Sequence, residues 1–480
     1  MRRELYLAGA FVALAVADET YTINATTNWG TWEGWGVSLA WWAKAFGDRD
    51  DLADIFFSLD NTTLGSQTLP GLGFNIARYN AGACSNNTYD DTSMVVSPDI
   101  TASRQMDGYW WDWASNDPDS SSWHWDVDAN QRAMLSKAAS RGANHLEIFS
   151  NSPMWWMLKN KNPSGSDDGS SDNLQSWNYA NHTQYLAEIA LYAKNNWGIT
   201  FESVEPFNEP SADWWKGTTG TQEGCHFDAS TQATIIPLMR SALNTRGLTS
   251  AIVSASDENT YDVAVSTFDD LGSTAIGDLG RINVHGYEDG SGDRGGLYDL
   301  ALDAGLALWN SEYGESDATG ESLVSNLILD FRWLHPTGWV YWQALDGGGW
   351  GLIEGDNVGL TVGSASQKYF CLAQFTRHIR EGMRILDGGA DHVVAAYDAT
   401  NSKLIIVAVN WGDAQYLNFE LSDFSTAGKS GQTIPRWSTQ ISSGDQYVSY
   451  PSDTVQSGTK FWSYFETDEV QTFEVANVKL

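Results

Sequence analysis

Eight short β-rich runs recur along residues 32–380, and segments with helical periodicity lie between them. The runs cover residues 32–39, 72–80, 145–153, 201–210, 251–258, 281–287, 307–314 and 338–345. Helical patterns are clearest at residues 50–59, 128–142, 183–198 and 323–335. Strands that alternate with helices favour a parallel sheet, and eight such units predict an α/β fold closed as a (β/α)8 TIM barrel.

A doubly wound sheet is the alternative fold for this pattern. It would prefer fewer units and a phosphate-binding loop near a strand end. The glycine-rich stretch "DGGGWG" at residues 346–351 lacks a following Lys-Ser/Thr and does not open a helix, so we interpret it as a flexible turn. The barrel is therefore the prediction.

The pattern of apolar and polar residues changes near both ends of the barrel region. After residue 385 the pattern alternates apolar and polar residues, which predicts a small antiparallel β-sandwich. We expect the barrel to cover residues 31–382 and the sandwich residues 383–480, with a strand from residues 18–30 joining the sandwich. Residues 1–17 combine Arg2 and Arg3, an apolar run and Ala-Val-Ala, which is typical of a secretory signal peptide.

The net charge of −34 limits the partners of this chain. Nucleic acids and anionic lipids bind through basic patches, so we expect neither nucleic acid nor a membrane as a partner. We expect a secreted, extracellular monomer that needs no cofactor and no metal. Glycosylation sequons at Asn24, Asn61, Asn86 and Asn181 are about as frequent as chance allows in so polar a chain.

Three cysteines allow one disulfide at most. Cys371 lies in an apolar helical pattern and is expected to be a buried thiol. Cys84 and Cys225 both lie in loop-like contexts, which makes them the favoured pair. The spacing of the cysteines and histidines does not resemble a zinc site.

Tryptophan is unusually abundant, with 24 residues. Five of them lie in the polar stretch 109–125, which has the composition of a long loop: Trp110, Trp111, Trp113, Trp123 and Trp125. Exposed indole faces stack on the apolar faces of sugar rings, whereas buried ones would pack the loop against itself. The sequence leaves both interpretations open.

Two strand ends carry glutamates whose position suggests catalysis. "EPFNEP" (205–210) ends the fourth run and contains Glu205 and Glu209, and Glu312 ends the seventh. In a barrel, catalytic groups lie at the carboxyl ends of the strands, and strands four and seven face each other across the mouth. Cleavage of a glycosidic bond requires one carboxylic acid and one carboxylate, and a separation of about 5–5.5 Å gives retention of configuration.

Several motifs identify a family. "FNEP" (207–210), "WNSEYG" (309–314), "SNSPMWWM" (150–157), "VHGY" (284–287) and "VYWQAL" (340–345) resemble glycoside hydrolase family 30 of clan A. The helix pattern "KYFCLAQFTRHIREG" before the sandwich matches as well, so the resemblance covers essentially the whole mature chain. Within the family, "EPFNEPSADWW" (205–215) and "GTQEGC" (220–225) are most similar to the fungal endo-β-1,6-galactanases.

The resemblance implies the roles of the strand-end residues. Glu209, in the Asn-Glu-Pro context, matches the acid/base, and Glu312 matches the nucleophile. Asn208 would hydrogen-bond the sugar 2-hydroxyl or the nucleophile, whereas Glu205 is expected to be structural. Glu315, past the end of strand seven, is interpreted as a loop residue that could touch substrate.

Further site residues are expected around these carboxylates. Arg78 on strand two could keep Glu312 ionised or form an ordinary ion pair, and Tyr287 and His285 could orient Glu312 or be core groups. Trp342 on strand eight is the best candidate for a sugar platform. Weaker candidates are Trp35, Trp155 and Trp156, since bulky apolar residues also fill the layers of a barrel.

The resemblance therefore predicts a retaining endo-glycosidase for β-1,6-linked galactan, such as arabinogalactan side chains. A β-1,6-glucanase, xylanase or glucosylceramidase is possible with the same glutamates, and a non-catalytic sugar-binding protein on this scaffold is a second class. A glucuronylated galactan would need a local cation, for which Lys216 is a candidate.

Overall fold

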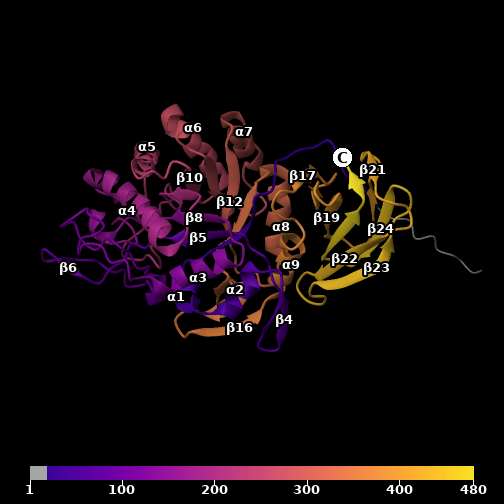
Figure 1. The fold of residues 1–480 in the computed structure, drawn as a ribbon, viewed down its shortest axis with the longest axis horizontal. Coiled ribbons are helices and arrows are strands. Elements are labelled where there is room, and N and C mark those ends of the chain that lie inside the picture. Colours follow the sequence, from indigo (N-terminus) through magenta and orange to yellow (C-terminus); the bar gives the residue numbers. More distant parts are fainter. Residues whose placement is uncertain (1–18) are drawn as a thin grey trace, which may run out of the picture.

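A computed structural model of the protein describes residues 19–480 (Figure 1). The signal peptide predicted for residues 1–17 lies outside the described residues. None of the helices within residues 19–480 is long and apolar enough to cross a membrane.

Eight parallel strands form a closed barrel, as predicted, and each run found in the sequence contains one of them. The strands are β2 (Gly34–Ser38), β5 (Ile76–Asn80), β8 (His145–Phe149), β9 (Ser203–Glu205), β10 (Ile252–Glu258), β11 (Arg281–His285), β12 (Ala307–Tyr313) and β13 (Gly338–Tyr341). All neighbouring pairs are parallel, so the carboxyl ends of all eight strands open on one face.

Helices follow each barrel strand and form the outer layer (Figure 1). They are α1 (Trp42–Phe46), α2 (Asp50–Phe57), α3 (Ala129–Ser140), α4 (Tyr179–Tyr192), α5 (Ala229–Thr245), α6 (Tyr261–Gly277), α7 (Arg294–Ala304), α8 (Glu321–Leu329) and α9 (Gln367–Thr376). Two of them continue as π-helical turns, at Ala193–Trp197 and Asp330–Leu334. Gly305, at φ 69°, ends α7 in the left-handed conformation that glycine adopts without strain.

The interior of the barrel contains a charged network instead of apolar layers alone. Glu147 on β8 accepts hydrogen bonds from Arg78 Nε (2.9 Å), Ser203 Oγ (2.7 Å) and Arg281. All of these side chains are buried, and a buried charge requires such paired partners. These contacts hold Arg78 in place inside the barrel, and its side chain extends from there toward the carboxyl ends of the strands.

The C-terminal region forms the predicted antiparallel sandwich (Figure 1, right). Its larger sheet has the order β17 (Arg384–Asp387), β18 (Val393–Asp398), β19 (Lys403–Asn410), β25 (Glu469–Ala476), β22 (Thr433–Gln440) and β23 (Val448–Val455). Its smaller sheet has the order β1 (Glu19–Thr22), β20 (Gln415–Glu420) and β24 (Lys460–Phe465). β1 runs parallel to β20, so a segment from the start of the described chain lies in this sandwich.

Alternate residues of the larger sheet belong to two different cores. Val394, Ile405 and Val407 join the core of the barrel. Leu404 and Ile406, on the opposite face, pack with residues of the smaller sheet. This period of two lets one sheet bind both the barrel and the smaller sheet.

Short sheets of two or three strands lie outside the barrel and outside the two sheets of the sandwich. They pair β3 (Asn61–Leu64) with β4 (Gln67–Pro70), β6 (Thr88–Tyr89) with β7 (Thr92–Ser93), β21 (Thr426–Ala427) with β26 (Val478–Lys479), and β15 (Ile353–Asp356) with both β14 (Leu345–Asp346) and β16 (Thr361–Ala365).

The predicted pairing of Cys84 with Cys225 is wrong in this structure, where both are free and buried thiols. The thiol of Cys84 donates to Glu223 Oε1 at 3.1 Å, and that of Cys225 is directed to the carbonyl of His226 at 3.6 Å. Each sulfur is thus occupied by a different hydrogen bond beneath the loops. Cys371, in α9, is a buried free thiol.

Candidate active site

Glu209 and Glu312 meet at the carboxyl end of the barrel. Glu312 lies in β12, and Glu209 follows β9 with a left-handed backbone conformation (φ 46°) that is fixed by a hydrogen bond from its amide to the carbonyl of Asp257 (2.8 Å). Both side chains are buried and line a cavity of about 520 Å³. Carboxylate oxygens of the two glutamates lie within 4.8 Å of each other.

His285, the last residue of β11, lies between these two carboxylates. Its Nδ1 is 3.1 Å from Glu209 Oε1 and 3.5 Å from Glu312 Oε1, and its Nε2 is 3.2 Å from Asp257 Oδ2. Burial opposes a charge on this imidazole, but the neighbouring Glu312 and Asp257 outweigh burial and raise the pKa of His285 well above its usual value. The ring is therefore a cation between three carboxylates.

Glu312 is surrounded by hydrogen-bond donors. Arg78 Nη1 is 3.3 Å from Oε2, and the Tyr287 hydroxyl donates to Oε1 at 3.0 Å. Burial raises the pKa of Glu312 to about 7, although His285 and Arg78 act to lower it. The donors favour the ionised form, which is the form that attacks as a nucleophile.

Glu205, the other glutamate of "EPFNEP", has no access to the cavity. Its side chain is fully buried at the end of β9 and accepts a hydrogen bond from the amide of Phe207 (3.3 Å). Burial, with Asp257 and Glu147 nearby, raises the pKa of Glu205 well above its usual range. Burial thus favours the neutral form of this carboxyl group within the core, which fits the expected structural role.

Two polar residues near the glutamates were missed by the sequence analysis, and both lie at the carboxyl end of β10, the fifth barrel strand. Asn259 donates a hydrogen bond to Glu209 Oε1 at 2.7 Å. Asp257 accepts from Arg78 Nη2 at 2.6 Å and from Ser311 Oγ at 2.5 Å. The polar run "SDEN" at the end of that strand was the signal that could have found them.

Asn208 and Glu315 differ in what they can offer a substrate. Asn208 is buried beside Glu209, and its Oδ1 has no hydrogen-bond partner among the described residues. Among the described residues it forms no hydrogen bond with Glu312, so of its two expected roles a hydrogen bond to substrate is the one that the geometry leaves open. Glu315 is held by an ion pair with Lys368 at 2.8 Å and lies away from the cavity lining.

The walls of the cavity are rich in aromatic rings. Trp342, the predicted platform, lines the cavity and makes an edge contact with Trp41 at 4.9 Å between ring centroids. The loop after β9 adds Trp214 and Trp215, and the glycine-rich turn adds Trp350. Of these, only Trp342 was expected from the sequence. "SADWW", directly after "FNEP", was a usable signal for Trp214 and Trp215.

The prediction that Trp35, Trp155 and Trp156 line the cleft is wrong, because all three are buried in the hydrophobic core. Their indole N–H groups donate within the protein, to Ile379 O (2.7 Å), Ser85 Oγ (2.6 Å) and Trp110 O (2.7 Å) respectively. Trp35 points outward from β2 and packs on Phe331 and Trp339 beneath the helices.

The tryptophans of residues 109–125 pack the loop against itself. Trp123 stacks on Trp110 and Trp125 at centroid distances of 4.7 and 5.2 Å, and Trp111 stacks on His124 at 3.5 Å. None of these rings belongs to the cavity lining described above. The structure therefore favours the second of the two interpretations.

The cation that reaches the cavity is different from the expected one. Lys216 is exposed and lies outside the lining. Arg104 lines the cavity instead, with its guanidinium 4.1 Å from the centroid of the Trp41 ring and a long contact of 3.9 Å to Asp346. It lies in a polar loop whose sequence gives no sign of this position.

A (β/α)8 barrel with two converging carboxylates and an aromatic cleft at its carboxyl end defines a glycoside hydrolase. Comparison with known proteins agrees with this class. Residues 14–279 match the model of "O-Glycosyl hydrolase family 30", which is more than half of the chain. The chain is 63% identical over 470 residues to an endo-beta-1,6-galactanase from Hypocrea rufa, covering 98% of this chain and 97% of that protein.

More distant relatives share the family or the fold. An exo-beta-1,6-galactobiohydrolase of Bifidobacterium longum is 24% identical over 71% of this chain and 28% of its own length. The catalytic domain of xylanase C from Talaromyces cellulolyticus superposes with a TM-score of 0.69 at 18% identity, over 95% of this chain and 100% of that one. The chain belongs to O-glycosyl hydrolase family 30.

Proposed function

We propose that this protein is a retaining endo-glycosidase that hydrolyses β-1,6-galactosidic linkages in galactan and arabinogalactan side chains. The observation that carries the mechanism is the separation of the two glutamates, whose oxygens lie within 4.8 Å of each other. Retaining enzymes need about 5–5.5 Å between carboxyl groups, whereas inverting enzymes leave about 6.5–9.5 Å for a water molecule. The substrate rests on the 63% identity to the Hypocrea rufa enzyme.

In this proposal Glu209 protonates the leaving oxygen while Glu312 attacks the anomeric carbon. The glycosidic C–O bond breaks as the bond from Glu312 forms, which gives a covalent glycosyl-enzyme. Glu209 then removes a proton from water, and the resulting hydroxide displaces Glu312 with overall retention. Asn208 would hydrogen-bond the sugar, and Trp342 would stack on it.

Four supporting residues would control the protons. Tyr287 and Arg78 hold Glu312 ready for attack through the contacts of 3.0 and 3.3 Å. His285 and Asn259 both contact the oxygen Oε1 of Glu209. No step requires a cofactor or a metal.

The test compares early products on unsubstituted β-1,6-galacto-oligosaccharides, β-1,6-glucan and glucuronoxylan. We expect mid-chain galactan fragments first, released as the β-anomer in the first minutes by ¹H NMR. The Glu209→Gln and Glu312→Gln variants should lose at least about 10³-fold in kcat, and Glu312→Gln should still bind the oligosaccharide. Cleavage of glucan or xylan alone would overturn the substrate, and an initial α-anomer would overturn the mechanism.

A sugar-binding protein without turnover is the second class. Its signature would be unchanged oligosaccharide affinity in both variants together with no products from the unaltered protein. Secretion and the monomeric state belong to the same proposal. They predict a mature N-terminus near Asp18 in material from the culture medium and a single-chain mass by light scattering.

A further inference from the structure

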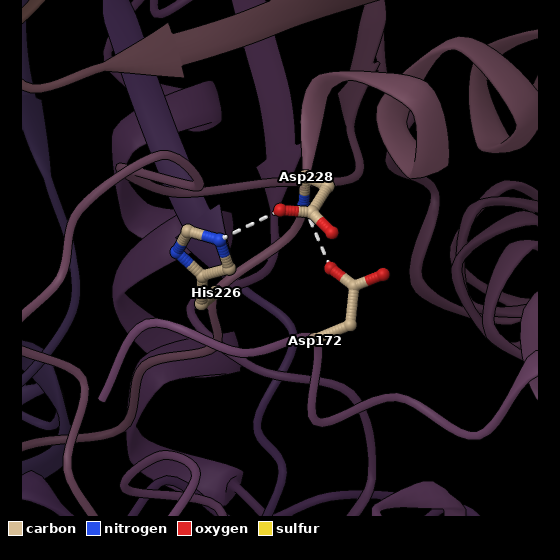
Figure 2. Close-up of side chains that lie close together, drawn as sticks. All are labelled: Asp172, His226 and Asp228. Atoms are coloured by element: carbon tan, nitrogen blue, oxygen red, sulfur yellow. Dashed lines mark hydrogen bonds and ion pairs between the residues drawn. The ribbon is translucent and has the colours of Figure 1, made fainter. Parts of the chain in front are cut away.

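Three potential metal ligands meet away from the two glutamates, between two loops of the barrel (Figure 2). Asp172 lies in the loop between β8 and α4. His226 and Asp228 lie at the end of the loop between β9 and α5, directly before that helix. One ligand atom from each residue lies within 4.8 Å of the others.

The imidazole of His226 has its tautomer fixed by the backbone. Its Nδ1 lies 2.8 Å from the carbonyl oxygen of Ala212, and a carbonyl can only accept, so Nδ1 carries the hydrogen. In the neutral ring, Nε2 then presents a lone pair. Nε2 lies 3.4 Å from Asp228 Oδ1, a contact that Figure 2 marks with a dashed line, and the His226 side chain is only 9% exposed.

A positive charge must lie between these two atoms, either as a proton on Nε2, which makes the contact an ion pair, or as a metal ion bound by both. A lone pair on nitrogen and a carboxylate oxygen repel each other unless a cation lies between them. A histidine that donates its other N–H to a backbone carbonyl is also the usual orientation of a metal ligand. The orientation of this buried ring therefore fits a metal ligand, and it is set by a backbone carbonyl outside the three residues.

The two carboxylates differ in how the protein holds them. Asp172 Oδ1 accepts from the amide of Asp228 (2.7 Å), and its Oδ2 accepts from Thr231 Oγ1 (2.6 Å). Each oxygen keeps a free lone pair, because a carboxylate oxygen has two. The side chain of Asp228 is largely exposed and makes no capping hydrogen bond with α5.

We propose that Asp172, His226 and Asp228 bind a divalent transition-metal ion, with Zn²⁺ as the first candidate. One imidazole nitrogen and two carboxylate oxygens suit Zn²⁺ with water as the fourth ligand, whereas Ca²⁺ and Mg²⁺ prefer oxygen alone. The site uses neither catalytic glutamate, so it stands apart from the reaction proposed above.

The metal would tie the cleft loop to its neighbour. The loop between β9 and α5 carries Trp214 and Trp215, which line the cavity. It already pairs with the preceding loop at Ser166 and Lys216. A metal between Asp172 and the end of this loop would add a second connection and hold the aromatic wall in place.

The experiment titrates the full chain with Zn²⁺ after treatment with EDTA. We expect one saturable site in isothermal titration calorimetry and a Tm higher by roughly 2–6 °C at a hundredfold excess over Kd. Ca²⁺ and Mg²⁺ at the same concentrations should leave the Tm within 1 °C. Failure of Zn²⁺ to saturate any site would show that His226 and Asp228 form a plain ion pair and would overturn the proposal.

The decisive variant is Asp228→Asn, because the exposed Asp228 side chain does not cap α5 and its contact with His226 is a long one of 3.4 Å. Its Tm without metal should match that of the unaltered protein, while its Kd for Zn²⁺ should rise about 10–100-fold. Asp213→Asn removes an exposed carboxylate from the same loop and should bind Zn²⁺ normally.

A competing site must be separated from this one. Glu209, His285 and Glu312 also place ligand atoms within 4.8 Å of one another. If Zn²⁺ binding survives Asp228→Asn but disappears in Glu312→Gln, the ion binds in the catalytic site and the proposal is wrong. If the pattern is reversed, the site between the loops stands, even where the proposed galactanase activity fails.

Discussion

Proton control in this site depends on a few charged residues around the two glutamates. His285 lies between Glu209 and Glu312 as a cation, and its Nε2 is 3.2 Å from Asp257 Oδ2. Arg78 contacts Glu312 and Asp257 together. The charge of Glu312, the proposed nucleophile, is thus set by neighbours on β5, β10 and β11.

At the residue scale, Tyr287→Phe tests how Glu312 is kept ionised. The variant removes the 3.0 Å donor to Glu312 and leaves the ring in place. A carboxylate that loses a donor has a higher pKa, and the proposed mechanism uses Glu312 in its ionised form. The acidic limb of the kcat/KM profile should therefore move upward by about 0.5–1.5 pH units, with kcat reduced roughly 10–100-fold.

Tyr313→Phe is the matched control, since its hydroxyl has no hydrogen-bond partner among the described residues. It should leave the acidic limb unchanged. A limb in Tyr287→Phe that stays in place, or moves to lower pH, would mean that the profile does not report the ionisation of Glu312.

At the scale of elements, the loops decide which sugar is bound. The strands supply the glutamates, but Trp41, Arg104, Trp214 and Trp350 come from four different connections. Loops at the carboxyl end of a barrel carry specificity because they vary without disturbing the strands.

Trp214→Ala tests the loop between β9 and α5 as a sugar-binding element. The ring is 49% exposed at the cavity, so its loss should raise KM for galacto-oligosaccharides about 5–30-fold with little change in kcat. Trp333→Ala is the control, since this ring is 46% exposed on the π-helical turn after α8 and is absent from the cavity lining. Equal effects of both variants would remove Trp214 from the binding site.

The order of strands and helices was predictable from the sequence because periodicity is a local property. Counting the β-rich runs identified the ends of the fourth and seventh barrel strands, which carry Glu209 and Glu312. The direction of a side chain was not predictable in the same way. Trp35 lies in a five-residue strand whose residues are all buried, so the burial pattern of that strand does not separate barrel interior from helix layer.

Contacts between distant loops were equally out of reach. Arg104 stacks on Trp41 across sixty-odd positions of chain, and neither local sequence indicates this contact. The disulfide prediction was wrong for the same reason, because the hydrogen-bond partner of Cys84 is Glu223, a residue of another loop. The resemblance to a family implied roles only for residues in the matching motifs, and most of these loop residues lie outside such motifs.

At the scale of the whole molecule, buried acids set how stability depends on pH. Burial raises the pKa of Glu223 to about 7 and that of Asp128 to about 7, and Glu312 has a similar value. In the unfolded chain these groups titrate near about 4. Between those values the folded state binds more protons than the unfolded one, so the free energy of unfolding falls as pH rises from about 4.5 through 7.

We therefore expect the Tm to be highest near pH 4.5–5 and to fall by several degrees toward pH 8, aided by the net charge of −34. Differential scanning fluorimetry across this range checks the trend. Glu223→Gln imitates the protonated acid, so it should match the unaltered protein at pH 5 and exceed its Tm at pH 8. If its Tm declines in parallel with that of the unaltered protein, Glu223 does not contribute.

The pairing of β1 with β20 has a consequence for synthesis. Thr20 and Asn418, which are hydrogen-bonded neighbours in these strands, are 398 positions apart. At a translation rate of about 5–20 residues per second, β1 waits roughly 20–80 s for its partner to leave the ribosome. During that time the barrel can close, but the smaller sheet of the sandwich cannot. Its completion is therefore a late, post-barrel event in the life of each new chain.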